Sequence, residues 1–185
     1  MIRIVLLAPF EELKEQAEEV FAEGMETGRA GNGREYDFCA VLAPTTAQAL
    51  SQNLDADVII ARGALAFDLK RRGGPIPIVE LVISGEDILN VLYKLKELYG
   101  AAPAGIIGST NMILGIEETA QRIGVDVTPY YLEENTDEEV YRAVVRAVED
   151  GKKVILGGMR GCIYARNLDA QTMLLTSGRS SIWNA

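Results

Sequence analysis

The sequence predicts an α/β fold made of two similar lobes, each a parallel sheet flanked by helices. Short runs rich in Val, Ile and Leu alternate with amphipathic helical patterns along the chain, and this order builds parallel sheets. The strand–helix order occurs twice, with related motifs in the two halves. A stretch of small residues, glycine and proline separates the halves. These observations indicate tandem duplication of one lobe.

Eight apolar runs are expected to form the strands. They are nearly continuous in apolar character, as in parallel strands that are covered on both faces. The runs are Ile2–Ala8, Tyr36–Ala43, Asp57–Ala61, Ile76–Ile83, Gly105–Gly108, Val125–Leu132, Lys153–Leu156 and Thr172–Leu175. Four of them fall in each half, so each lobe is expected to contain one four-stranded sheet.

The segments between these runs carry helix signals. Leu13, Ala17 and Val20 share one face of the first helix, with Glu and Lys opposite. Two later helices have capping-box patterns at their starts, which are Ser84 with Asp87 and Thr136 with Glu139. The final helix begins near Ser180 and is expected to continue in a longer polypeptide, by analogy with the helix after Ser84.

The duplication is visible in two pairs of motifs. Val58-Ile-Ile-Ala-Arg-Gly63 and Val154-Ile-Leu-Gly-Gly158 each lead from a strand into a glycine-containing turn. Each half then closes with Ser-Gly before an Ile-bearing helix, at Ser84-Gly85 and at Ser177-Gly178. We therefore predict a first lobe over residues 1–98, a hinge over residues 99–103 and a second lobe over residues 104–185.

Composition argues against several classes of function. The chain of 185 residues carries 18 basic and 27 acidic residues, and its net charge of −9 gives no broad footprint for nucleic acid or anionic membrane. It contains no histidine, which removes Ser-His-Asp triads, Cys-His pairs and conventional zinc sites. No apolar stretch reaches the roughly 20 residues of a membrane span. We expect a cytoplasmic domain without metal, cofactor or catalytic residues, and without direct contact to nucleic acid or membrane.

A ligand site is expected beyond the carboxyl ends of the strands, where loops meet helix N-termini. Hydroxyl, amide and guanidinium groups gather there, and they suit a small carboxylate. The candidate residues are Arg62, Gly63, Glu80, Ser84, Gly85, Ser109, Thr110, Asn111, Gly157 and Arg160. Arg62 and Arg160 stand as cations at comparable places in the two halves.

Most of these residues also have a purely structural interpretation. Ser84 can serve only as a helix cap, and the glycines can serve turns that need positive φ. Glu80 lies in the middle of a strand, where it needs an arginine or backbone donors as partner. The sequence leaves both interpretations open.

An enzyme of similar architecture is the main rival. Two-lobed α/β amino-acid racemases use one cysteine from each lobe as paired acid and base, and this chain has one cysteine in each half. Cys39 falls inside the second strand, whereas Cys162 follows the third strand of the other lobe. Because these places are not equivalent, the cysteines are expected not to form such a pair.

Two segments resemble the N-terminal sensory domain of propionate-catabolism activators. They are Asp57-Val-Ile-Ile-Ala-Arg-Gly-Ala-Leu-Ala66 and Pro75-Ile-Pro-Ile-Val-Glu-Leu-Val-Ile-Ser-Gly-Glu-Asp-Ile-Leu89. The resemblance extends over nearly the whole chain, through Ile107–Asn111 and Val154–Gly158. It implies two chelatase-like lobes with an effector site in the cleft between them. It also implies a bacterial activator that works with sigma-54 polymerase through downstream ATPase and helix-turn-helix domains.

The resemblance bears on the site and the effector. Arg62, Gly63, Glu80, Ser84 and Asn111 match positions of the family motif. The family's propionate regulator responds to 2-methylcitrate, but here Gly157-Gly158 stands where the family usually has Gly-Asp. The effector therefore stays open.

We expect the chain to sense a small effector by closure of its two lobes. The expected partners are a carboxylate-type effector, the downstream ATPase and DNA-binding domains of the same polypeptide, and, as one option, a second copy in a homodimer. The alternative function is an isomerase, racemase or lyase that acts on a small acid in the same cleft. A solute-binding protein is less favoured because the N-terminus lacks a signal peptide.

Overall fold

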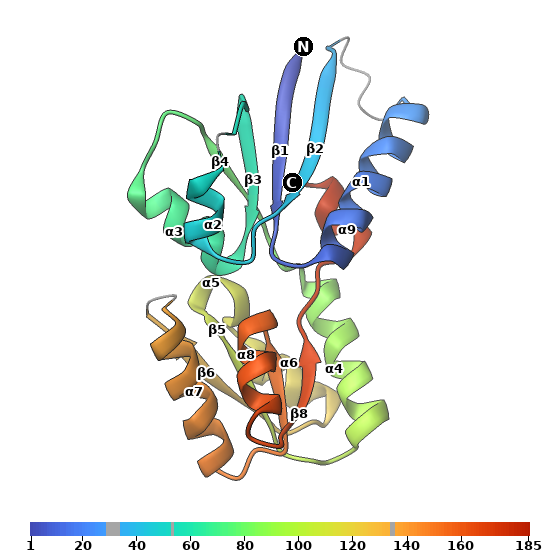
Figure 1. Ribbon diagram of the computed structural model, residues 1–185. Coiled ribbons are helices and arrows are strands. Elements are labelled where there is room, and N and C mark those ends of the chain that lie inside the picture. Colours follow the sequence, from blue (N-terminus) through green and yellow to red (C-terminus); the bar gives the residue numbers. More distant parts are fainter. Residues whose placement is uncertain (29–33, 53, 134–135) are drawn as a thin grey trace. The chain divides into compact units, whose positions relative to one another are not determined.

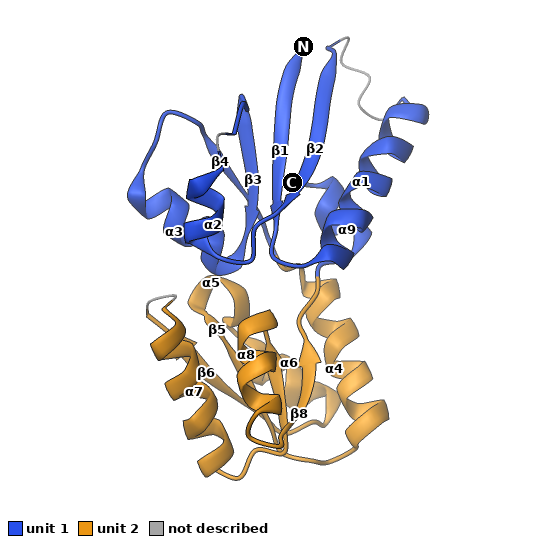
Figure 2. Cartoon of the chain, in the orientation of Figure 1, with its two compact units in different colours: residues 1–82, 177–185 blue, residues 83–176 orange. Residues whose placement is uncertain are grey.

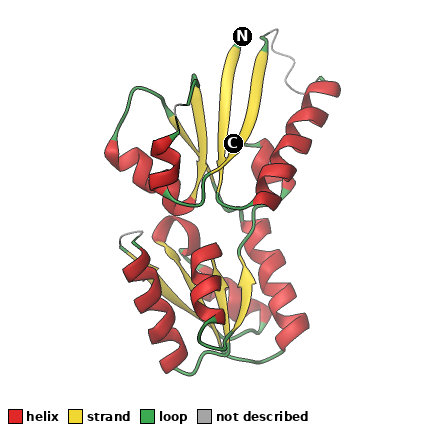
Figure 3. Cartoon of the chain, in the orientation of Figure 1, coloured by secondary structure: helices red, strands yellow, loops and turns green. Residues whose placement is uncertain are grey.

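Two compact α/β units make up the computed structural model, which describes residues 1–28, 34–52, 54–133 and 136–185 (Figure 1). Unit 1 contains residues 1–82 and 177–185, and unit 2 contains residues 83–176 (Figure 2). Each unit holds one four-stranded parallel sheet with helices on its faces (Figure 3). The predicted fold class of two similar α/β lobes is therefore confirmed.

Unit 1 is built on a sheet in the order β2-β1-β3-β4. Its strands are β1 (Ile2–Ala8), β2 (Tyr36–Leu42), β3 (Val58–Arg62) and β4 (Ile78–Leu81). Helices α2 (Thr46–Ser51) and α3 (Gly63–Arg72) cover one face, where Val5, Leu7 and Ile59 pack with Leu65. Helix α1 (Glu11–Glu26) and the short α9 (Arg179–Trp183) pack together on the other side of the sheet (Figure 1).

Unit 2 repeats this design with the strand order β6-β5-β7-β8. Its strands are β5 (Ala104–Ser109), β6 (Val127–Leu132), β7 (Val154–Gly157) and β8 (Gln171–Leu174). Its helices are α4 (Gly85–Tyr99), α5 (Thr110–Ile113), α6 (Ile116–Ile123), α7 (Asp137–Glu149) and α8 (Met159–Arg166). Helices α4, α5 and α6 contribute to the core on one face of the sheet, and α7 and α8 to the core on the other.

The strand pairing relates the two units residue by residue. The first strand of each sheet pairs with the third, with Ile4 opposite Val58 in unit 1 and Ala104 opposite Val154 in unit 2. Val58 and Val154 are therefore equivalent positions, in agreement with the repeat in the sequence. The same strand order in both sheets indicates duplication of one lobe.

The last helix of each repeat packs in the other unit. Helix α4 follows β4, yet its buried side chains Val91, Leu92 and Leu95 belong to the core of unit 2. Helix α9 follows β8 of unit 2 and packs against α1 of unit 1. Each helix buries its apolar face where a sheet face lacks cover, and this burial stabilises the exchange.

The unit boundaries consequently differ from the predicted ones at residues 98 and 104. The chain passes between units at residues 82–83 and 176–177. The predicted hinge, residues 99–103, lies inside unit 2, where Tyr99 and Ala102 pack against its core. The Ala102 N–H also donates a hydrogen bond of 3.1 Å to the Tyr99 carbonyl oxygen. Glycine and proline here mark a turn between α4 and β5.

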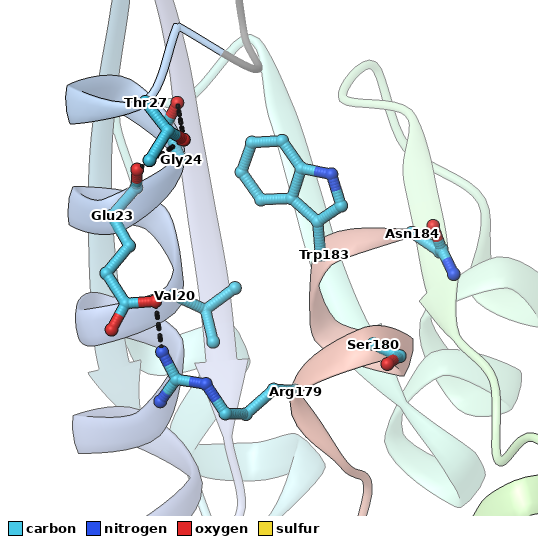
Figure 4. A pocket seen from close by; sticks show the side chains of 8 residues that line it. All are labelled: Val20, Glu23, Gly24, Thr27, Arg179, Ser180, Trp183 and Asn184. Carbon is cyan, nitrogen blue, oxygen red and sulfur yellow. Dashed lines mark hydrogen bonds and ion pairs between the residues drawn. The ribbon is translucent and has the colours of Figure 1, made fainter.

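The contact between α1 and α9 depends on a glycine. Gly24 is buried in α1, and the Trp183 indole lies against it (Figure 4). A Cβ atom added to Gly24 would lie 1.9 Å from Trp183 Cζ3 and 2.2 Å from Cη2. No side chain fits at this position while the indole stays in place.

Replacement of Gly24 by alanine is expected to displace the indole. Gly161→Ala is the matched control, since Gly161 also lies in a helix and the nearest atom to its added Cβ, Val140 Cγ1, is 4.0 Å away. We expect Gly24→Ala to lower the free energy of unfolding by about 1–3 kcal/mol through overpacking. The control should gain up to about 1 kcal/mol from helix propensity.

Trp183 reports the difference directly because it is the only tryptophan in the chain. Its emission should shift to longer wavelength in Gly24→Ala and stay unchanged in Gly161→Ala. Urea unfolding of both variants gives the stabilities. An unchanged emission spectrum in Gly24→Ala would contradict the packing of this helix pair.

Candidate functional site

The carboxyl ends of the four parallel strands lie at one edge of the sheet in each unit, and the candidate residues follow these edges. Those in unit 1 are Arg62, Gly63 and Glu80. Those in unit 2 are Ser84, Gly85, Ser109, Thr110, Asn111, Gly157 and Arg160. Ser84 and Gly85 were predicted in the first lobe and belong to unit 2, because α4 packs there.

Arg62 places a positive charge at the carboxyl edge of unit 1. It is the last residue of β3 and the N-cap of α3, and only 6% of its surface is exposed. Its guanidinium carbon lies 6.0 Å from the centroid of the Phe10 ring, which follows β1. A buried arginine is uncommon, because removing a charge from water is costly unless other groups compensate for it. Arg62 is therefore the strongest candidate for binding an anion.

Gly63 has a conformational reason to be glycine. Its φ of +53° opens α3 in the left-handed region, where a side chain would cause strain. This agrees with the structural interpretation of the residue.

Glu80 has the partner that its place in a strand requires. Its carboxylate accepts a hydrogen bond of 2.9 Å from Lys70 Nζ, a side chain of α3. The predicted partner was an arginine or backbone donors, and the structure shows a lysine from the helix that precedes β4. This ion pair favours a structural role for Glu80 at the α3–β4 contact.

Ser84 closes the predicted capping box of α4. Its hydroxyl accepts the Asp87 N–H at 3.1 Å, and the Asp87 carboxylate accepts the Ser84 N–H at 2.9 Å. Gly85 is the first residue of the helix, with open space around it. The cap explains Ser84 without a ligand.

Ser109 is the last residue of β5 and the N-cap of α5, and Thr110 and Asn111 are the first two residues of α5. The Ser109 hydroxyl donates a hydrogen bond to Asn111 Oδ1. Gly157, at the end of β7, is held by close packing: an added Cβ would lie 2.9 Å from the Ile107 carbonyl oxygen of β5. The requirement at Gly157 is thus a close backbone approach, not the positive φ considered for the sequence.

Arg160 is held by an acidic partner on a neighbouring helix. It is the second residue of α8, and its Nη1 lies 2.8 Å from Asp137 Oδ1 at the start of α7. Arg62 directly precedes α3, whereas Gly158 has that place before α8. The two arginines are therefore offset along the repeat and do not occupy equivalent positions.

The two cysteines lie in different environments. Cys39 is exposed on β2, and partial burial together with the charges of Asp37 and Glu18 raises its pKa. Cys162 is buried in α8, and burial raises the pKa of its thiol to about 11. A thiol with so high a pKa is protonated near neutral pH and is a poor base.

In the described ranges, no cluster of His, Cys, Asp and Glu is suited to a metal ion. None of the helices described there is long and apolar enough to span a membrane.

Comparison with known proteins decides the family. The sequence pattern of the family described as propionate catabolism activator matches residues 42–185. The chain belongs to this family. Its predicted resemblance to the sensory domain of these activators is thereby confirmed. No curated sequence shows significant similarity to it.

Solved structures share the fold of this propionate catabolism activator domain. An NtrC family transcriptional regulator from Clostridium acetobutylicum matches with a TM-score of 0.76 and 18% identity, covering 100% of this chain and 92% of that one. A conserved domain protein from Vibrio cholerae matches with a TM-score of 0.52 and 13% identity, over 98% and 75% of the chains. A sugar-binding protein of a Bacillus halodurans transporter matches with a TM-score of 0.50 and 17% identity, covering 93% of this chain and 73% of that one.

One further feature of this activator domain was missed from the sequence. A recess of about 840 Å³ lies between α1 and α9, and its lining includes Glu23, Thr27, Arg179 and Trp183 (Figure 4). Arg179 spans it, with Nη2 2.6 Å from Glu23 Oε2 and Nη1 3.2 Å from Glu19 Oε2. The sequence placed Arg179 in the second lobe, so no pattern suggested this contact with α1.

Variants of two caps separate the structural role of Ser84 from a role in binding. Thr136 caps α7 in the same way, with its hydroxyl accepting the Glu139 N–H at 3.2 Å, and is the matched control. Ser84→Ala and Thr136→Ala should each lower the free energy of unfolding by about 1 kcal/mol. Ser84→Asp should keep the cap and its stability. If Ser84 contacts the effector, Ser84→Asp should weaken anion binding and the control variant Thr136→Asp should not. Equal binding by Ser84→Asp and Thr136→Asp would show that Ser84 is not part of the site.

The thiols are expected to differ sharply in reactivity. At pH 8 a disulfide reagent should modify Cys39 in the native protein and reach Cys162 only after unfolding, since burial and a high pKa both protect it. The rate at Cys39 should rise with pH, because its raised pKa keeps the thiolate fraction small at neutral pH. Cys39→Ser is the control. Fast modification of native Cys39→Ser would show a reactive Cys162 and revive the isomerase alternative.

Proposed function

We propose that this chain is the cytoplasmic effector-sensing domain of a sigma-54-dependent bacterial transcription activator, and that it binds a small carboxylate and signals by lobe closure. The observation that carries the proposal is the family match over residues 42–185. The partners in this proposal are the effector and the downstream ATPase and DNA-binding domains of the same polypeptide. A second copy of the chain, forming a homodimer, is a further partner.

Arg62 supports a carboxylate as effector. Its planar guanidinium has donors arranged to bind both oxygens of a carboxylate at once. The N-terminus of α3 begins at the next residue, and its free N–H groups and dipole also favour an anion. Only a small part of the Arg62 surface is exposed, so water screens its charge little. Each hydrogen bond between Arg62 and a bound anion is therefore stronger than it would be at the protein surface.

Unit 2 can supply a second set of polar groups. Arg160 is paired with Asp137, and an effector carboxylate would compete with Asp137 for it. Ser109 and Asn111 offer a hydroxyl and an amide at the end of β5. We propose that an effector which uses both sets draws the carboxyl edges of the two sheets together.

Such closure is a shift in population between open and closed states. The effector stabilises the closed state only by as much as it binds that state better. To change the ratio of closed to open molecules from 1:99 to 99:1, the effector must bind the closed state about 5.5 kcal/mol more tightly than the open state. The motion is proposed to occur at the two chain crossings, residues 82–83 and 176–177. Residues 99–103 are packed within unit 2, so the proposed hinge is at these two crossings instead.

A thermal-shift screen with carboxylates tests the site. 2-Methylcitrate, citrate and smaller mono- and dicarboxylates are the probes, and a binder at 100 times its dissociation constant stabilises the folded state by about 2.7 kcal/mol. Arg62→Gln and Arg160→Gln should each abolish the shift. Arg122→Gln is the control, because Arg122 is exposed and paired with Glu118 along α6. A full shift in both test variants would contradict the site.

Closure is tested with the acid that binds. A spin label at native Cys39 in unit 1 and another at Leu114→Cys, where the side chain of unit 2 is 75% exposed, report the distance between units. Saturating effector should shorten this distance in the wild-type background and leave it unchanged in Arg62→Gln. An unchanged distance with bound effector would retain sensing and rule out lobe closure.

A further inference from the structure

One buried hydroxyl differs from the other buried polar groups of the described residues. The buried polar side chains there are Arg62, Asp87, Ser177 and Ser181. The Asp87 carboxylate takes part in the cap of α4. Only 2% of Ser177 is exposed, and within the described parts of the chain its Oγ has no hydrogen-bond partner. Such a hydroxyl destabilises the fold, because it has lost its bonds to water and gained none in return.

Ser177 lies where the chain enters unit 1 for the second time. It is the first residue after the crossing from unit 2 (Figure 2). Two residues earlier, the Leu175 N–H donates a hydrogen bond of 2.8 Å to the carbonyl oxygen of Gly157, the last residue of β7. The crossing therefore leaves the carboxyl edge of a parallel sheet, which is the edge beyond which α/β sheets bind ligands.

The repeat shows that the fold itself does not require a hydroxyl at this position. Ser177 directly precedes Gly178, the N-cap of α9. Ile83 directly precedes Ser84, the N-cap of α4, so Ile83 and Ser177 are equivalent and the two Ser-Gly pairs are offset by one residue. Ile83 packs against the core of unit 2. At the same place in unit 1, the serine puts a polar atom where the other repeat has an apolar contact.

A carboxylate effector needs more donors than one arginine supplies. Its two oxygens offer about four lone-pair sites, and a bidentate guanidinium fills two of them. Arg62, the last residue of β3, is the proposed cation of unit 1. A serine hydroxyl is a neutral donor, so it can fill a further site without adding charge.

We propose that Ser177 is an effector-binding residue whose hydroxyl donates a hydrogen bond to a carboxylate oxygen of the ligand. This rests on the proposed sensing function, because it assigns the partner of the hydroxyl to the effector. The motion proposed at residues 176–177 changes the cover of Ser177 directly, so the ligand reaches the hydroxyl as the chain moves there. The serine therefore destabilises the ligand-free chain and stabilises the ligand-bound one.

The stability of the ligand-free chain separates this role from a structural one. Ser177→Ala deletes an unpaired hydroxyl, so it should raise the melting temperature by about 2–4 °C. Thr136→Ala is the matched control, because the Thr136 hydroxyl accepts the Glu139 N–H at 3.2 Å. Its loss should lower the melting temperature by about 2–4 °C. A lower melting temperature in Ser177→Ala would show that its hydroxyl has a structural partner and would overturn the proposal.

Affinity is measured by titration calorimetry with 2-methylcitrate, citrate and smaller mono- and dicarboxylates. Ser177→Ala should bind the acid that the wild-type chain binds about tenfold or more weakly, as for a lost hydrogen bond to a charged group. Thr136→Ala should bind it as tightly as the wild-type chain does. Ser177→Thr keeps the hydroxyl and should recover most of the lost affinity.

The outcomes distinguish failure of this proposal from failure of the sensing function. If none of the acids binds the wild-type chain, both are wrong. If an acid binds the wild-type chain and Ser177→Ala equally well, sensing stands and Ser177 has no part in the site. Equal losses of affinity in Ser177→Ala and Thr136→Ala would reflect a general effect on the fold and would also overturn the proposal. A higher melting temperature together with weaker binding, in Ser177→Ala alone, is the result that the proposal requires.

Discussion

Each repeat ends in a helix whose apolar partner is the sheet of the other unit, and this exchange governs the rest of the structure. Val91, Leu92 and Leu95 of α4 are buried in the core of unit 2, which is one continuous segment, residues 83–176, whereas unit 1 combines residues 1–82 with residues 177–185. Removing α4 would expose the strands beneath it to water. The hydrophobic effect therefore fixes both the unit boundaries and the two crossings between them.

The parallel order of the strands accounts for the placement of the candidate site. Because every strand in a unit runs in the same direction, the last residues of β3, β5 and β7, which are Arg62, Ser109 and Gly157, lie at the carboxyl edges of their sheets. Other features nearby have structural causes. Glu80 pairs with Lys70, and Gly157 makes room for the backbone of β5. Arg62 differs from these in placing a buried positive charge at the end of β3, directly before α3.

Sequence patterns predicted the elements of this fold and failed on their assignment to units. Apolar runs located all eight strands, and the capping box at Ser84 located the start of α4. Helical periodicity shows that one face of α4 is apolar but does not say which sheet that face covers. The Arg160–Asp137 pair was missed for the same reason, since contact between α7 and α8 depends on tertiary packing. The close approach at Gly157 likewise arises only when β5 and β7 pair.

Duplication made the two units alike in topology, and the helix that ends each repeat packs in the other unit. Helix α4 covers one sheet face of unit 2 together with α5 and α6, and α9 packs beside α1 at the equivalent face of unit 1, where it buries Ile182. Trp183 holds α9 in place because Gly24 leaves room for its indole. That close contact fixes the position of α9 on α1, and it sets Arg179 of α9 beside Glu19 and Glu23 of α1, with which the guanidinium forms ion pairs.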